Sequence, residues 1–126
     1  MRAQASAEFL VVISALLLFF IIFYTVYVDL LGNLSISRDR LAATEKAASL
    51  AAAFNYVHLA GTGASIDFTM AYNPKSDDIT ISGLAVESRI GEARAQAPLL
   101  LYVDDPIQIT SGSFTIRNDR GVVVIE

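Results

Sequence analysis

A run of twenty uncharged residues near the N-terminus constrains this chain more than any other feature. Residues 9–28 read FLVVISALLLFFIIFYTVYV, and Glu8 and Asp29 flank them. At about 1.5 Å per residue, such a helix is roughly 30 Å long and matches the hydrocarbon core of a bilayer. A cleavable secretory signal usually has a shorter apolar core, of about 7–15 residues, and ends at a small-residue cleavage site. We therefore expect residues 9–28 to remain in the mature chain as a membrane-spanning helix.

The charges beside this run predict its orientation. Arg2 precedes it, and no Lys or Arg follows it before Arg38. Because positively charged flanks remain in the cytoplasm, we expect a cytoplasmic N-terminus, with residues from Asp29 onward outside the cell. The chain has no cysteine, so a hydrophobic core rather than disulfides must hold the exterior part together.

The composition argues against several functional classes. The net charge of −4 leaves no basic patch for nucleic acid, so we expect no nucleic-acid binding. With one histidine, no cysteine and no glycine-rich phosphate loop or serine elbow, we predict no enzymatic activity and no cofactor. The aspartate pairs at 77–78 and 104–105 lack the ligand spacing of a calcium loop, and we expect solvated turns without metal there.

Residues 30–59 favour a continued helix, because they are rich in alanine and contain no proline. Leu34, Leu41 and Ala48 recur every seven residues and predict a packing stripe on this helix. The stripe narrows to alanine, so we expect a sheet or neighbouring helices to press on residues 47–53, with Ala48 and Ala52 buried. The glycines of the segment 61–63 provide a natural helix end.

The apolar pattern changes from helical to alternating after residue 63, which predicts a β-rich head. The first strand covers residues 66–72, and the segment 73–78 is rich in turn-forming residues. We expect further strands at 79–82, 84–89, 99–103, 107–110, 113–117 and 122–125. Residues 118–121 join the last two as a hairpin, and residues 93–97 fit a loop or a strand.

These short strands form a meander or a small sandwich whose core needs the alanine-rich helix for completion. The fold class is therefore α+β, with a long N-terminal helix and a small antiparallel β head. The predicted inward-facing positions of the head are Ile66, Phe68, Met70, Leu84, Val86, Phe114, Ile116, Val122 and Val124.

The residues ahead of the apolar run, MRAQASAE, carry Gln4, Ser6 and Glu8. This Q-x-S-x-E pattern after a very short basic leader resembles the class III signal peptide of archaeal type IV pilin-like proteins. In that family a membrane peptidase cuts just before the glutamine, on the cytoplasmic side, and leaves the apolar helix on the subunit. The resemblance implies cleavage between Ala3 and Gln4.

The resemblance also implies an organisation and a function. Residues 1–3 would be the leader, 4–29 the transmembrane and filament-core helix, 30–60 its amphipathic continuation and 61–126 the β-rich head. The chain would be a structural subunit of an extracellular type IV pilus-like filament for surface adhesion, anchored in the membrane before assembly. Its partners would be further copies of itself, a prepilin peptidase, an assembly ATPase and a platform membrane protein.

Glu8 has two interpretations. Packed among other helices, its carboxylate loses solvation, and the new α-amino group of Gln4 on a neighbouring subunit would compensate it and fix the stagger. Alternatively, Glu8 lies at the membrane interface, where the dipole of the helix N-terminus favours a negative charge. The neighbouring Gln4 and Ser6 favour the assembly role. Asn33 begins a glycosylation sequon, but its place on a packed helix favours an unmodified side chain.

Two other functions share these features. One is a single-pass membrane-anchored protein that binds at the cell surface without polymerising, and the other is a secretion-system pseudopilin. A non-polymerising anchor needs only lipid-facing side chains, whereas a filament subunit continues its packing stripe beyond the membrane. Leu34, Leu41 and Ala48 continue that stripe.

Overall fold

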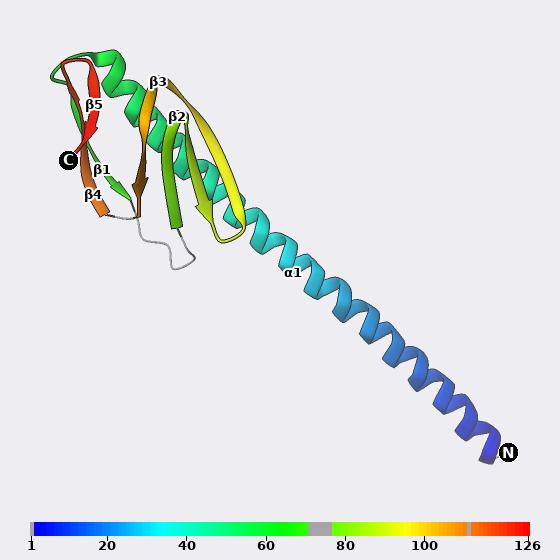
Figure 1. The fold of residues 1–126 in the computed structure, drawn as a ribbon. Coiled ribbons are helices and arrows are strands. Elements are labelled where there is room, and N and C mark those ends of the chain that lie inside the picture. The colour runs from blue at the N-terminus through cyan, green and yellow to red at the C-terminus, as the bar shows by residue number, and fades with distance from the viewer. Residues whose placement is uncertain (1, 71–76, 111) are drawn as a thin grey trace. The chain divides into compact units, whose positions relative to one another are not determined.

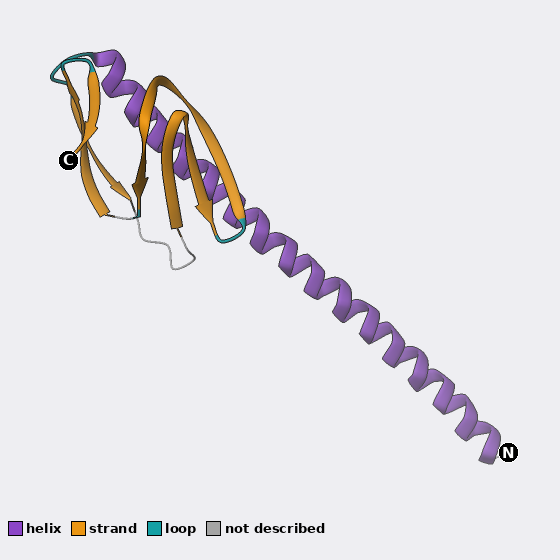
Figure 2. Ribbon diagram, viewed as in Figure 1, coloured by secondary structure: helices purple, strands orange, loops and turns teal. Residues whose placement is uncertain are grey.

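One helix and five strands make up the fold of the computed structural model, which describes residues 2–70, 77–110 and 112–126 (Figures 1 and 2). The elements are α1 Arg2–Ala60, β1 Ser65–Met70, β2 Asp77–Ile90, β3 Ala93–Ile109, β4 Gly112–Asp119 and β5 Val122–Ile125. This arrangement confirms the predicted α+β class. The chain divides into two compact units, which we call the N-terminal unit, Met1–Ser35, and the strand-rich unit, Ile36–Glu126.

The N-terminal unit is helical throughout its described residues and buries none of its large apolar side chains. The exposed fractions of those in residues 9–31 range from 37% at Ile13 to 69% at Tyr24. The hydroxyls of Ser14 and Thr25 donate to backbone carbonyls four residues earlier, at 2.8 and 2.9 Å. These two polar groups are therefore satisfied without water, as an apolar environment requires.

The core of the strand-rich unit forms around one face of its helical segment. Its helical members recur at intervals of three and four residues, which places them on one side of a helix. They are Ala43, Ala47, Leu50, Ala51, Ala53, Phe54 and Val57. The strands contribute Met70, Ile79, Ile81, Val86, Ala97, Leu99, Ile109 and Ile116 to the same core. The expectation that a sheet presses on the segment 47–53 is confirmed.

The predicted orientation of this helical segment is wrong for two alanines. Ala48 and Ala52 are exposed, although we expected both to be buried. A helix turns by about 100° per residue, so a face centred on Leu50 and Phe54 directs these two alanines to the opposite side. Leu41, from the predicted packing stripe, is likewise 70% exposed.

The strands form two antiparallel sheets, one ordered β1-β4-β5 and one made of β2 and β3. In the first sheet, Phe68 of β1 lies opposite Phe114 of β4, and their ring centroids are 5.6 Å apart. The predicted hairpin is confirmed, since β4 and β5 pair antiparallel. Arg120 and Gly121 turn the chain with φ of 55° and 91°, as a two-residue type I′ turn requires.

The second sheet is a two-stranded ribbon that bends midway, as Figure 1 shows. The strands expected at 79–82 and 84–89 are two parts of β2, and those at 99–103 and 107–110 belong to β3, except Thr110. The ambiguous segment 93–97 is strand. Gly83, with φ of 57°, lies between two register shifts. From the pair Ile81↔Ile107 to the pair Ala85↔Pro98, β2 advances four residues and β3 nine, so β3 follows the longer, outer path of the bend.

Three of the nine predicted inward positions are wrong. Leu84 is 58% exposed, because the shifts around Gly83 interrupt the alternation of β2. Val122 is 64% exposed, and Val123 and Ile125 pack on the core instead, so β5 presents the other set of its alternating side chains. Val124 is half-buried but shares the outward face of β5 with Val122. Of the remaining six, Met70, Val86 and Ile116 are buried, and Ile66, Phe68 and Phe114 are half-buried against the core.

The turns expected around the aspartate pairs have different outcomes. Residues 71–76, which include the end of the first predicted strand and most of the 73–78 turn, lie outside the described residues. Asp78 belongs to β2. Asp104 and Asp105 are exposed, as expected, but they lie within β3 rather than in a turn.

Asn118 ties the β4–β5 turn to the end of α1. Its side chain, in a residue only 2% exposed, donates to the Val57 carbonyl at 3.3 Å and accepts from the Gly121 amide at 2.8 Å. Its backbone accepts from the amide of Gly63 and donates to the carbonyl of Ala64, both at 2.9 Å. One asparagine therefore satisfies polar groups from the helix end, the following loop and the hairpin turn.

Candidate functional site

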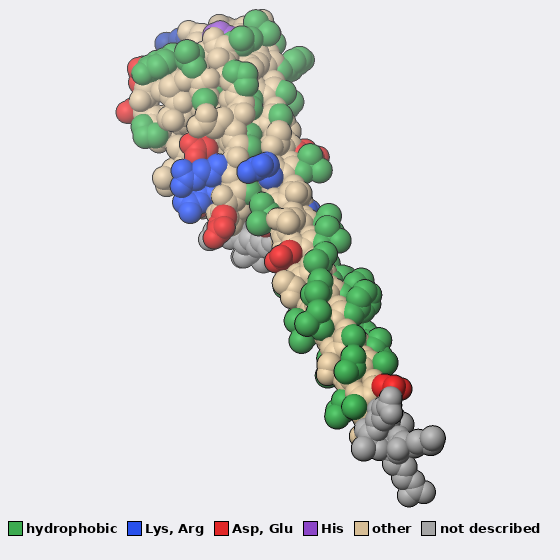
Figure 3. Space-filling model, turned by 90° about the vertical axis from the view of Figure 1, so that its right-hand side faces the viewer, with side chains coloured by type: hydrophobic (Ala, Val, Ile, Leu, Met, Phe, Trp, Pro, Cys, Tyr) green, Lys and Arg blue, Asp and Glu red, His purple; other side chains and the backbone are tan. Residues whose placement is uncertain are grey.

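The helix of the N-terminal unit exposes its large apolar side chains from residue 9 to residue 31, and we call this area the N-terminal apolar surface. Figure 3 shows its hydrophobic side chains along the helix. By its length and composition, the helix is apolar enough to cross a membrane. Exposed apolar area costs roughly 25 cal/mol per Å² in water. This surface is therefore compatible with membrane anchoring, and lipid or other protein has to cover it.

The residues of the predicted processing site belong to the same helix. The backbone of Ala3 and Gln4 is helical and lies within α1. Gln4 and Glu8 are four residues apart, which corresponds to about one helical turn. The Glu8 side chain is exposed, and among the residues described here its carboxylate has no ion-pair partner. Both interpretations of Glu8 agree with this arrangement in a single chain.

Asn33 lies on the helix of the N-terminal unit, and its side chain is exposed. Leu34 and Ser35, the other residues of the sequon, are exposed as well. The packed position that favoured an unmodified Asn33 is therefore not found within this unit. The unmodified state of Asn33 stays a prediction.

A second exposed apolar area lies on the helical segment of the strand-rich unit. We call it the outer stripe, and it consists of Leu41, Ala48, Ala52, Tyr56 and Leu59. Its three large side chains are 70%, 62% and 73% exposed at Leu41, Tyr56 and Leu59. At about 100° per residue, the stripe lies opposite the buried face centred on Leu50 and Phe54. This helical segment therefore has a second, largely apolar face, interrupted by the exposed Glu45, which its own strands leave uncovered.

The buried face was missed in the sequence, although a signal for it exists. Leu50, Phe54 and Val57 are spaced four and three residues apart, which is the pattern of a core-facing helix. The seven-residue repeat of Leu34, Leu41 and Ala48 is a genuine regularity, but it marks the exposed side. Glu8, Leu34, Leu41 and Ala48, from the assembly prediction, are thus exposed on the helix. Leu50, Phe54 and Val57, which hold the fold together, lie on the covered face.

His58, at the helix end, is half-buried. Across the described parts of the chain, no three His, Asp or Glu side chains gather in a way that could hold a metal ion. Comparisons with protein families, with curated proteins and with solved structures found no match to this chain.

Proposed function

We propose that this chain is a structural subunit of an extracellular filament of the archaeal type IV pilus kind, which polymerises through its N-terminal helix. The outer stripe is the observation that carries the proposal. It belongs to the unit with the hydrophobic core, outside the run of residues 9–28 that a bilayer would cover. Lipid therefore leaves the stripe exposed, and protein has to cover it.

The energetic argument compares the membrane with a bundle of helices. Withdrawal of the N-terminal apolar surface from lipid is acceptable only when close packing between helices replaces the lipid contacts. Burial of the outer stripe between subunits would stabilise the filament by about 1.5–3 kcal/mol for each large aliphatic side chain that leaves water. A non-polymerising single-pass anchor gains nothing from such a stripe. A secretion-system pseudopilin would use both surfaces in the same way.

The N-terminal residues have defined roles in this proposal. Cleavage between Ala3 and Gln4 creates an α-amino group, which pairs with Glu8 of a neighbouring subunit in the apolar bundle. The pair forms at one stagger of parallel helices only, so it sets the axial register. A prepilin peptidase, an assembly ATPase and a platform membrane protein supply processing and extraction, and the finished filament serves adhesion at the cell surface.

The deciding experiment introduces a charge into the outer stripe. Leu41→Glu leaves the core untouched, because Leu41 is exposed, and it places an anion where a neighbouring subunit has to pack. We expect sheared cell-surface material to lose its filaments in electron micrographs, while the membrane fraction retains the subunit. Leu84→Glu is the matched control, since Leu84 is likewise exposed but lies on β2, outside the stripe.

Mass spectrometry of the sheared material gives a second, independent readout. The N-terminal peptide of the filament subunit should begin at Gln4. Wild-type cells that display the protein but yield no filaments would favour the anchored surface-binding protein. Normal filaments from the Leu41→Glu variant would remove the stripe from the assembly interface.

A further inference from the structure

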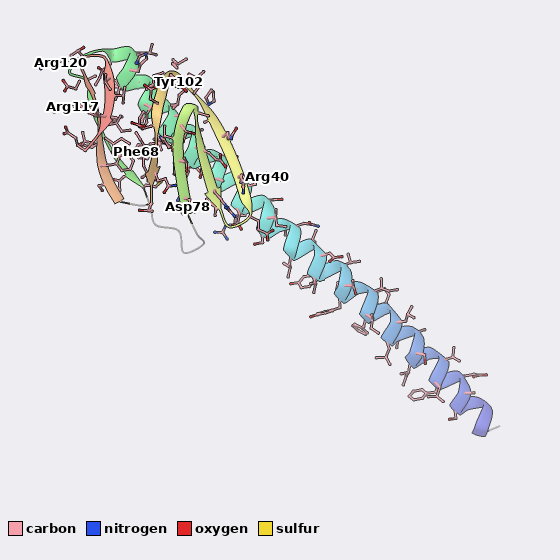
Figure 4. All side chains as sticks on the ribbon, in the orientation of Figure 1. Arg40, Phe68, Asp78, Tyr102, Arg117 and Arg120 are labelled. Atoms are coloured by element: carbon pink, nitrogen blue, oxygen red, sulfur yellow. The ribbon has the colours of Figure 1, made fainter. Side chains whose placement is uncertain are left out.

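The bent β2–β3 ribbon carries a polar pocket. The pocket has a volume of about 350 Å³, within the range of roughly 300–1,000 Å³ that is usual for small-ligand sites. Residues from both halves of the ribbon line it, so it exists because the ribbon bends. These residues are Asp78, Thr80, Glu87, Arg89, Arg94 and Gln108. In Figure 4, Asp78 lies on β2, well apart from Arg117 in the β1-β4-β5 sheet.

Two arginines face each other at one side of this pocket. Arg89 and Arg94 are directly opposite in the β2–β3 register, and both are exposed. Like charges at directly opposed positions of a sheet are destabilising. The Nε of Arg89 donates to the Gly91 carbonyl at 3.2 Å. Within the described ranges, neither guanidinium forms an ion pair with a carboxylate. A bound anion would remove the repulsion between them.

The other groups of the pocket restrict which anion fits. Glu87, which accepts a hydrogen bond from Gln96 at 3.3 Å, and Asp78 contribute two carboxylates that repel a second negative charge on a ligand. Together with Thr80 and Gln108, they offer hydrogen-bond acceptors to hydroxyl groups. The planar fork of an arginine matches a carboxylate bidentately. The pocket thus combines a carboxylate-binding side with a hydroxyl-binding side.

We propose that this pocket binds a hydroxylated monocarboxylate of the uronic acid type, with the carboxylate on Arg89 and Arg94 and the sugar hydroxyls on the acidic and amide side chains. The ligand can come from a free sugar acid or from an acidic polysaccharide outside the cell. The proposal is independent of polymerisation, because the lining residues lie on β2 and β3 and none belongs to the outer stripe or to the N-terminal apolar surface.

The test uses the full ¹⁵N-labelled chain in micelles of an uncharged detergent. Sodium glucuronate should shift the amide resonances of residues 78–80, 87–96 and 108. Glucose and sulfate should each bind at least about tenfold more weakly, since glucose lacks the carboxylate and sulfate lacks the sugar hydroxyls. Arg94→Gln and Arg89→Gln should each weaken glucuronate binding by about tenfold or more. If polygalacturonate binds more tightly per sugar than glucuronate, an acidic polysaccharide is the source of the ligand. If the two affinities per sugar are equal, the ligand is the free sugar acid.

Arg117→Gln is the matched control, because Arg117 is an exposed arginine of β4 outside the pocket. It should bind glucuronate as the wild type does. Both pocket arginines are exposed and repel each other, so their glutamine variants should fold, and unchanged core resonances will verify this. Equal affinity for sulfate and glucuronate, or an equal loss of glucuronate affinity in the Arg117→Gln variant, would overturn the proposal. Shifts confined to residues away from the pocket lining would overturn it as well.

Discussion

The two units of this protein contain similar helical stretches and treat their apolar side chains in opposite ways. In the N-terminal unit every described large apolar side chain is exposed. In the strand-rich unit, the strands cover one apolar face of the helical segment and leave the outer stripe exposed. The comparison separates two uses of hydrophobicity. One apolar face stabilises the single chain, and the exposed surfaces require a partner, whether lipid or protein.

The largest expected contrast comes from two phenylalanines. Phe54→Ala removes a fully buried ring from the core of the strand-rich unit and should lower its free energy of unfolding by about 3–5 kcal/mol. Phe20→Ala removes a ring that is 63% exposed and should leave that free energy unchanged. Chemical denaturation of the full chain in micelles, followed by near-ultraviolet circular dichroism, measures both. Equal effects would abolish the distinction between the units.

Two adjacent alanines sharpen the comparison within one helix. Ala47→Arg puts a large cation into the core and should destabilise the strand-rich unit by about 2–4 kcal/mol. Ala48→Arg puts the same side chain on the outer stripe and should leave the melting temperature unchanged while it impairs filament formation. A drop in melting temperature for Ala48→Arg comparable to that for Ala47→Arg would contradict the assignment of the two faces.

A smaller effect should separate two asparagines. Asn118→Ala leaves the Val57 carbonyl and the Gly121 amide without their side-chain partner and should cost about 1–3 kcal/mol. Asn33→Ala, in the N-terminal unit, should change stability by less than about 0.5 kcal/mol. Denaturation midpoints of the two variants provide the comparison. An Asn118→Ala variant as stable as the wild type would mean that these hydrogen bonds make no net contribution to the free energy of unfolding.

The smallest effect on stability, and a large one on assembly, is expected at Glu8. Glu8→Gln should leave unfolding of the strand-rich unit unchanged, and it makes membrane residence easier because a charge is removed. Filament yield should nevertheless fall, since the proposed partner of the carboxylate is the α-amino group of a neighbouring subunit. Quantification of sheared filaments against membrane-bound subunit tests this. A normal yield would leave Glu8 as a membrane-interface residue.

The parts of the fold that could be predicted depend on local sequence. The length of the apolar run dictates a long helix, and the turn at residues 118–121 dictates a hairpin. The covered face of the helix could not be chosen in this way, because Leu41 and Ala48 on one side and Leu50 and Phe54 on the other are both periodic. Only the strands that follow determine which side becomes the core.

Features that depend on distant contacts were equally out of reach. The bend of the ribbon results from the extra residues of β3 opposite Gly83, and neither strand alone reveals it. Asn118 lies in a predicted turn, yet its role depends on a carbonyl that is 61 residues away in the chain. The polar pocket of the ribbon arises from the same bend, since it joins residues of β2 and β3 that lie on both sides of the bend.

The sequence of β3 also opposes the pairing of this strand with a strand of another copy of the chain. Pro98 and Pro106 lie in this strand and have no backbone N–H, and Asp104 and Asp105 add exposed charge between them. Prolines and charges on an edge strand prevent the addition of a strand from another molecule. In the proposed filament, β3 is therefore a poor template for the addition of a strand from a neighbouring subunit.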